Sequence, residues 1–238
     1  MLAVGALFDA ACAAQDVELS RMASRPLATQ EASPKVAAAA AGVMTSATEE
    51  RSPDTSLAVS AHPSDVIELE VDGPHSPPLR CGFSNPMPGG VMAGYRADTG
   101  LDIAGSPRDV FALAAGTIEY AEAGHTLWNG RNDSPYALRI RLDVPIAFEG
   151  REITHIWYAH LSELAREVHE GGAENVHVAA GARVGKSGSA NGCAHLHVGM
   201  LLDGEVEQHW GTFLLEDKVR EVLCGWPART SLPALPKR

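Results

Sequence analysis

The sequence predicts a mainly β protein, built as a compact antiparallel β-sheet or sandwich with one or two short helices. Short apolar stretches recur at regular spacing between residues 65 and 204, and glycine-containing turns separate them. Several stretches alternate apolar and polar residues. The 238-residue chain has 23 glycines and 15 prolines, which indicate many turns. Strands at this spacing, joined by small turns, are typical of an all-β sheet or sandwich.

The first predicted strand lies in DVIELEVDG, residues 65–73, where Val66, Glu68 and Glu70 alternate with apolar neighbours. A period of two is the signature of a strand with one exposed face. The later strands are expected in GLDIAG (100–105), DVFALAAGTIEYAE (109–122, two strands around Gly116), YALRIRLDV (136–144), ITHIWYAHL (153–161), VHVAAGARVGKSG (176–188) and AHLHVGMLLDG (194–204).

Two segments have helical features. SELAREVHE, residues 162–170, begins with Ser162 as a possible N-cap and carries Glu163 in its first turn. LLEDKVREVL, residues 214–223, has apolar residues at helical spacing and an i,i+4 pair of opposite charge. We therefore expect helices in both segments.

The chain divides into four regions by composition. Residues 1–15 read either as a truncated signal peptide, with an apolar run followed by small residues, or as an alanine-rich disordered terminus. Residues 16–64 are rich in Ala, Pro and Ser and predict a disordered linker. Residues 65–226 form the predicted β domain, and the proline-broken residues 227–238 are expected to be a loose tail.

The charge balance excludes two classes of partner. A net charge of −11 argues against a protein that binds nucleic acid by neutralising phosphates. It also leaves no polybasic patch for an anionic membrane surface. No apolar stretch approaches the length needed to span a bilayer, so we expect no transmembrane segment.

The most distinctive polar pattern is NGCAHLHVGM, residues 191–200. In a strand, His195 and His197 would share one face while Leu196 and Val198 pack on the other. Two imidazoles on one face are explained by a metal, a carboxylate or a catalytic role, or they are simply surface histidines. Asp98 and Asp102 in DTGLD and His160 in YAHLSE add donors that zinc accepts. The five candidate donors are Asp98, Asp102, His160, His195 and His197.

The order of these motifs resembles the lysostaphin/LytM-type zinc metallopeptidases, which cut peptide bonds in bacterial cell-wall peptidoglycan. The stretch DTGLDIAGSPRDVFALAAGTIEYAE is similar to the family's first motif region, YAHL to its Y-x-H-L motif, and AHLH to its closing H-x-H. The valines and glycines of VHVAAGARVGKSGSANG are similar to the V..G..V..G..G pattern that precedes H-x-H in the family. The resemblance covers roughly residues 80–212 and implies the lysostaphin-type peptidase fold.

Carried over position by position, the resemblance implies a zinc cofactor held by Asp98, Asp102 and His197. It places His160 and His195 at the catalytic centre and makes peptidoglycan stem or cross-bridge peptides the partner. Tyr158, two residues before His160, is expected to share its face and to orient the substrate, or else to be a packed core residue. The presumed substrate implies an exported protein, periplasmic or extracellular. The oligomeric state is left open.

The chain departs from the family pattern at Asp98, where the family has histidine. Aspartate ligates zinc at nearly the same bond length as imidazole, but its side chain is shorter, and a second carboxylate makes the metal a weaker Lewis acid. The alternatives are a zinc endopeptidase with altered ligands or a degenerate, non-catalytic relative that binds peptidoglycan or activates another hydrolase.

Three other features of the sequence lie outside the expected site. GARVGKS at 181–187 lacks the spacing of a nucleotide-binding loop. A disulfide between Cys81 and Cys224 would tie the two ends of the domain together, although sequence alone does not give connectivity. The histidines expected at the surface are His125, His155, His169 and His177.

Overall fold

The computed structural model describes residues 66–69, 75–94, 98–105, 107–126, 132–209 and 211–227. The predictions for the signal peptide at 1–15, the linker at 16–64 and almost all of the tail at 227–238 fall outside these described residues. Within them, the chain forms one sheet of ten strands and one α-helix, so the mainly β fold class is confirmed.

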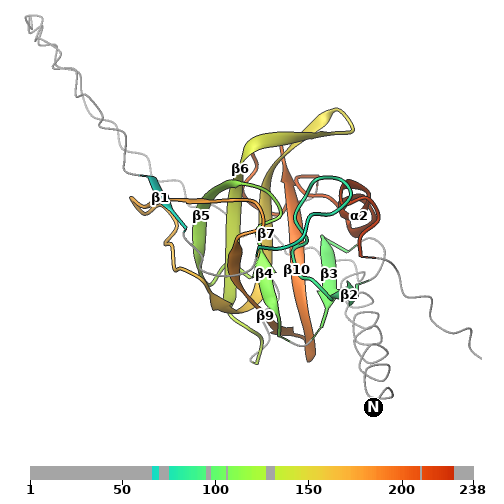
Figure 1. Ribbon diagram of the computed structural model, residues 1–238, viewed down its shortest axis with the longest axis horizontal. Coiled ribbons are helices and arrows are strands. Elements are labelled where there is room, and N and C mark those ends of the chain that lie inside the picture. The colour runs from blue at the N-terminus through green and yellow to red at the C-terminus, as the bar shows by residue number, and fades with distance from the viewer. Residues whose placement is uncertain are drawn as a thin grey trace, which may run out of the picture.

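The strands of the sheet run in the order β1-β8-β5-β6-β7-β9-β10-β3-β2, and β4 pairs with β9 off this path (Figure 1). All pairs are antiparallel except β1 with β8. The elements are β1 Val66–Glu68, β2 Val91–Met92, β3 Leu101–Ala104, β4 Asp109–Phe111, β5 Gly116–Ala123, β6 Tyr136–Phe148, β7 Arg151–Leu164, β8 Asn175–Val178, β9 Arg183–Ala190, β10 Cys193–Leu202 and α2 Glu216–Val222.

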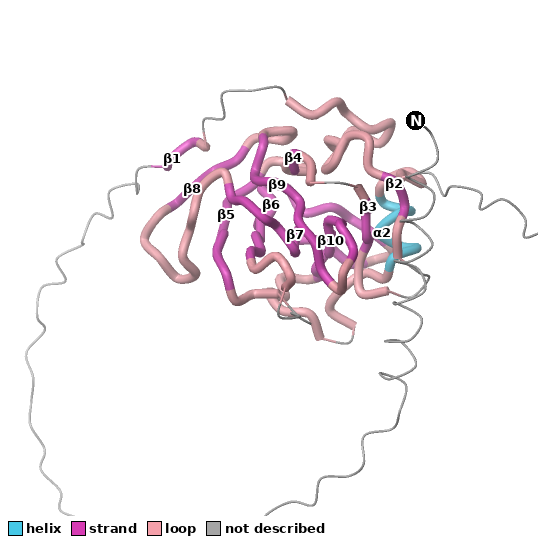
Figure 2. Tube along the Cα trace, turned by 90° about the horizontal axis from the view of Figure 1, so that it is seen from below, coloured by secondary structure: helices cyan, strands magenta, loops and turns pink. Residues whose placement is uncertain are grey.

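The main hydrophobic core lies on one face of this sheet. Leu196, Val198 and Met200 alternate along β10, and each has no exposed surface. Burying one such side chain stabilises the fold by roughly 1.5–3 kcal/mol. Helix α2 adds Val219 to the same cluster and lies beside β3 (Figure 2). The core therefore fixes which face of β10 remains for polar residues.

Strand β7 changes partners in its middle. Up to Ala159, which lies opposite His197, it pairs with β10. From Leu161, which lies opposite Ser187, it pairs with β9. His160, between them, has a φ of 62°. A non-glycine residue in this left-handed region is uncommon, and here it interrupts the alternation of side chains at the point where the strand changes partners.

The two predicted helices had different outcomes. Helix α2 confirms the prediction for residues 214–223. The helix expected at 162–170 is wrong, because Ser162 to Leu164 continue β7. The next backbone groups bond to strands rather than within a helix: Ala165 N donates to Val184 O, and Val168 N donates to Ala121 O. Tertiary pairing thus overrides the local helical pattern.

Two further expectations concern cysteines and charge. Cys81 and Cys224 are free thiols, so the predicted disulfide is not formed. A hydrogen bond with Cys81, which favours the protonated form of Cys224, nevertheless raises the pKa of the Cys224 thiol, so the two side chains lie in contact.

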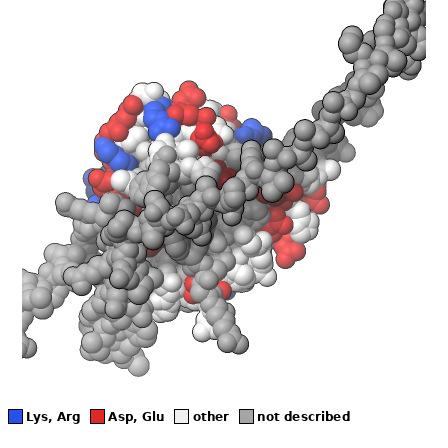
Figure 3. All heavy atoms as spheres, turned by 180° about the vertical axis from the view of Figure 1, so that it is seen from behind, with Lys and Arg blue, Asp and Glu red and all other residues white. Residues whose placement is uncertain are grey.

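No described helix has the length and apolar character to cross a bilayer. Acidic side chains are spread over the part of the surface that is visible in Figure 3, as the net charge of −11 leads one to expect.

Candidate active site

The register between β10 and β3 places His197 directly opposite Asp102, and His195 opposite Ala104. The Nδ1 atom of His197 donates to the Oδ1 atom of Asp102 at 2.7 Å. Because Leu196 and Val198 are fully buried in the core, the two histidines share the other face. The alternation predicted for this strand is confirmed.

His160 completes a cluster of three imidazoles. Its ring centroid lies 5.0 Å from that of His195 and 6.2 Å from that of His197, with the rings at steep angles. All three residues are buried, with at most 8% of their surface exposed. Within the described structure, His160 Nδ1 and His197 Nε2 have no hydrogen-bond partner. Unpartnered polar atoms are costly to bury, so the cluster has unused capacity to bind.

The hydrogen bonds fix the tautomer of His195. Its Nδ1 atom lies 3.1 Å from the carbonyl oxygen of Cys193. A carbonyl only accepts, so Nδ1 carries the proton. Nε2, on the other side of the ring, faces the site, where the Oδ2 atom of Asp102 lies 3.9 Å away.

Burial and charge set the protonation states in the cluster. Burial opposes the charge on Asp102, but His195, together with the hydrogen bond from His197, holds the pKa of this carboxyl well below its usual range. Burial, with the charges of His195 and His197, lowers the pKa of His160 to about 3. Burial opposes the charge on His197, while its hydrogen bond to Asp102 raises the pKa of His197. At neutral pH the site therefore holds an ionised Asp102 and a neutral His160.

Asp98 lies beside this cluster. Its Oδ2 atom and the Cβ atom of Asp102 both border Gly94, at 3.6 and 3.3 Å from the position of a Cβ added there. Its Oδ1 atom accepts the backbone N–H of Thr99 at 2.7 Å. The negative charge of Asp98 contributes to the raised pKa of His197. The carboxylate is thus in the neighbourhood of the predicted site but turned partly toward its own backbone.

The donor set fits zinc in kind, since imidazole nitrogen and carboxylate oxygen are its common ligands. Its arrangement fits only in part: the described residues contain no group of three or more His, Cys, Asp or Glu side chains arranged to bind a metal. Two ligand atoms on one tetrahedral zinc lie about 3.3 Å apart, and His197 Nδ1 and Asp102 Oδ1 are 2.7 Å apart. To bind one ion, these two atoms would have to move apart and Nδ1 would have to lose its proton. Cys193 is disulfide-bonded and supplies no thiolate.

Tyr158 does not lie with the histidines, so of its two expected roles the structure has the packed core residue and not the substrate contact. Its side chain is fully buried in the main core. Its hydroxyl oxygen accepts the backbone N–H of Leu113 at 2.8 Å. Tyr158 and His160 are two residues apart and would share a face in a regular strand. The left-handed backbone at His160 breaks this alternation, so the two side chains face opposite sides of the sheet.

Trp157 is a neighbour of the site that the motifs did not indicate. Its ring meets that of His197 edge-on, with centroids 5.5 Å apart. Gln208, from the loop after β10, donates from Nε2 to the carbonyl oxygen of Thr99 at 3.3 Å. A Cβ on Gly199 would lie close to both Trp157 and Gln208. The one sequence signal for Trp157 is its spacing: it lies two residues before Ala159, on the same face of β7, and Ala159 pairs with His197.

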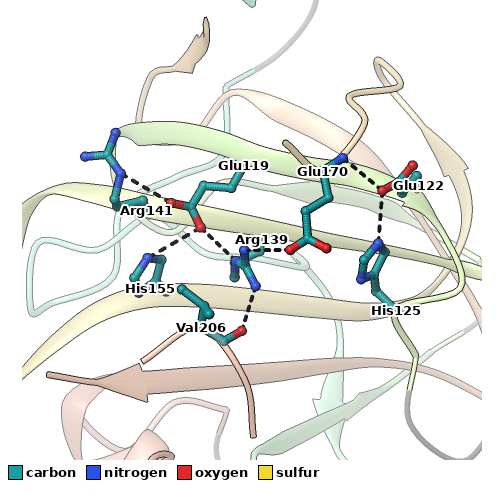
Figure 4. A network of polar contacts seen from close by, with 8 residues as sticks. All are labelled: Glu119, Glu122, His125, Arg139, Arg141, His155, Glu170 and Val206. Atoms are coloured by element: carbon teal, nitrogen blue, oxygen red, sulfur yellow. Dashed lines mark hydrogen bonds and ion pairs between the residues drawn. The ribbon is translucent and has the colours of Figure 1, made fainter. Parts of the chain in front are cut away.

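A polar network holds this same loop against the sheet (Figure 4). Arg139, which is 6% exposed, donates to Glu119 at 2.8 Å, to Glu170 at 3.1 Å and to the carbonyl oxygen of Val206 at 2.6 Å. His155 belongs to the network, with Nε2 3.5 Å from Glu119. It is 3% exposed, so the expectation of a surface histidine was wrong.

No protein-family model matches the sequence, and comparison with curated proteins gives no match. Solved structures show weak similarity. Lysostaphin from Staphylococcus simulans is 20% identical, with a TM-score of 0.40 over 68% of this chain and 59% of that one. A Pseudomonas aeruginosa protein named for the M23 peptidases is 20% identical, with a TM-score of 0.35 over 54% of this chain and 49% of that one. The mutant catalytic domain of a prophage-encoded M23 protein from Enterococcus faecalis is 18% identical, with a TM-score of 0.36 over 62% and 93%. The chain thus spans about three fifths of the length of lysostaphin and about half the length of the Pseudomonas protein.

Proposed function

We propose that this chain is a zinc-dependent endopeptidase that hydrolyses peptide bonds in bacterial cell-wall peptidoglycan. The observation that carries the proposal is the meeting of four side chains named by three separated motifs: Asp102 from the first, His160 from the second, and His195 and His197 from the third. An exported location, periplasmic or extracellular, is part of the proposal because that is where the substrate lies.

In this proposal Asp102 and His197 hold the metal, and Asp98 joins them after its side chain turns. When bound, zinc would polarise the scissile carbonyl and lower the pKa of water. The supporting electrostatics are local. The ionised Asp102 is 8% exposed, and a cation beside it would offset the cost of burying its charge.

The other two histidines act on protons and developing charge. His160 is neutral at working pH, because its pKa is lowered to about 3, so its unpartnered Nδ1 atom is available as a donor or an acceptor. His195 keeps its proton on Nδ1 and offers Nε2 to the site. A neutral imidazole that offers a lone pair accepts a proton, and an N–H that faces a developing oxyanion stabilises it.

A second function has one observation in its favour. The three expected ligands do not form a preassembled metal group among the described residues, and Asp98 replaces a histidine of the family pattern. A non-catalytic relative would use the same face to bind wall peptides or to activate another hydrolase.

Release of soluble peptide fragments from purified peptidoglycan tests the proposal. We expect release by the full chain, its loss on chelation, and its recovery on adding zinc. His197→Ala should abolish release, whereas His169→Ala, which changes an exposed histidine outside the site, should leave it unchanged. Binding to peptidoglycan with no release, at any zinc concentration, would favour the non-catalytic alternative and contradict the proposal.

A further inference from the structure

A separate cavity lies between the proline-rich segment before β2 and the start of β4. Its volume is about 430 Å³, and none of its lining residues belongs to the histidine cluster. The backbone joins the two sides, since Phe111 N donates to the carbonyl oxygen of Pro86 at 3.0 Å. Pro77, Pro88 and Phe111 give the cavity an apolar part. Its polar part comes from His75, Arg108 and Asp109.

Arg108 differs from most cationic side chains of the described structure. Of its ten lysines and arginines, eight form ion pairs, and Arg80 and Arg108 do not. The other charge on the cavity wall, Asp109, is already paired with Arg183 at 2.8 Å. A guanidinium without a carboxylate partner therefore faces an opening in a chain whose net charge is −11.

The backbone around Arg108 leaves room for its guanidinium. A Cβ on Gly89 would stand 3.1 Å from Arg108 Nη1, and a Cβ on Gly105 would stand 3.1 Å from Nε. Both contacts are tighter than side chains ordinarily make, so the two glycines leave the room that the guanidinium occupies. The main chain of Arg108 is fixed as well: its N–H donates to Ser187 Oγ at 3.0 Å, and its carbonyl accepts the N–H of Ser187 at 2.8 Å. The side chain therefore starts from a fixed backbone, beside the room that the two glycines leave.

We propose that this cavity binds a ligand with a carboxylate on a small, partly apolar body, such as the carboxyl terminus of a short peptide, and that Arg108 anchors the carboxylate. A guanidinium presents two parallel N–H groups that match a carboxylate or a phosphate. The proline and phenylalanine wall favours the carboxylate of a peptide over a fully hydrated phosphate. The volume lies within the range of sites for small ligands. The inference does not depend on peptidase activity.

Calorimetric titration of the full chain tests this inference. The probes are N-acetyl-alanyl-alanine, its carboxyl-terminal amide and inorganic phosphate. We expect the acid to bind about tenfold or more tightly than the amide, since only the acid makes the charge-assisted pair. Arg108→Gln should weaken binding of the acid by about tenfold or more. Arg108→Lys, which keeps the charge but loses the paired N–H groups, should fall between the two.

Arg80→Gln is the matched control, because it removes the other unpaired arginine of the described structure. We expect this variant to bind the acid like the unchanged chain. Equal affinity of the chain and Arg108→Gln would overturn the inference, as would an equal loss in Arg80→Gln. Binding of phosphate without the dipeptide would overturn the ligand class. If Arg108→Gln fails to fold, as judged by thermal melting, Arg108→Lys and the acid-to-amide ratio decide the question.

Discussion

His197 and Asp102 face each other across the β10–β3 ladder, and their side chains are joined by a hydrogen bond of 2.7 Å. Asp102 is 8% exposed and ionised, and its charge is stabilised by His195 and by this hydrogen bond from His197. His197→Ala is expected to destabilise the fold by about 3–5 kcal/mol, the cost of leaving a buried charge unpaired. Chemical denaturation measures this loss.

The double variant His197→Ala/Asp102→Ala separates the cost of the unpaired Asp102 carboxylate from the cost of the lost packing. It should be more stable than His197→Ala alone, because the unpaired carboxylate is gone. His169→Ala, in an exposed ion pair, should change stability by at most about 1 kcal/mol. Simple additivity of the two single substitutions would contradict the coupling.

Asp98→His is expected to increase zinc affinity. Histidine is longer than aspartate and restores the residue that the family pattern has at this position, and it removes one of two negative ligand charges. We expect affinity to rise by about tenfold or more, as measured by competition with a chelating dye. Asp98→Asn, which removes the charge without adding an imidazole, is the control and should bind zinc more weakly than the unchanged chain. Equal affinity in all three chains would place residue 98 outside the metal site.

Tyr158→Phe tests the structural role of this tyrosine. The substitution leaves the buried N–H of Leu113 without its acceptor, which costs about 1–3 kcal/mol. Because the ring lies in the core, peptidoglycan binding should not change. A co-sedimentation assay with peptidoglycan, paired with thermal melting, gives both quantities. Weaker peptidoglycan binding at unchanged stability would contradict the structural role and indicate that Tyr158 contacts the substrate.

The docking of β1 is expected to depend on pH through His177. The ring joins Asp143 of β6 at 2.7 Å and Glu68 of β1 at 2.9 Å, and these carboxylates raise its pKa. Because the pKa of His177 is higher in the folded state, its ion pairs stabilise the fold fully when the pH is below the pKa of the unfolded state, about 6.5. This stabilisation is lost as the pH rises through the pKa of the folded state. His177→Gln should therefore lower the melting temperature at about pH 5.5 and much less at about pH 8.5. An equal effect at both pH values would show that the ion pairs do not contribute.

The strands and the shared face of His195 and His197 were predictable because both follow from local alternation. Every predicted strand is present, and helix α2 also followed from its spacing. The direction of the His160 side chain was not predictable from alternation. Its left-handed backbone arises where β7 stops pairing with β10 and begins to pair with β9. The same exchange caused the error at Tyr158.

Long-range contacts account for the other failures. The segment after Ser162 has a helical pattern, but β9 and β5 supply its backbone partners. His155 is buried because Glu119 and Arg139, from other strands, meet it. Asp102 was placed with the histidines by the family resemblance and not by any local pattern, since strand register across 95 residues is not encoded in either segment alone.

Anomalous diffraction at the zinc absorption edge, from crystals of the full chain grown with zinc, tests the central claim most directly. We predict one strong peak about 2.0–2.2 Å from a carboxylate oxygen of Asp102 and an imidazole nitrogen of His197, with the Asp98 side chain turned toward it. The absence of a peak between these two residues, with their hydrogen bond intact, would contradict it.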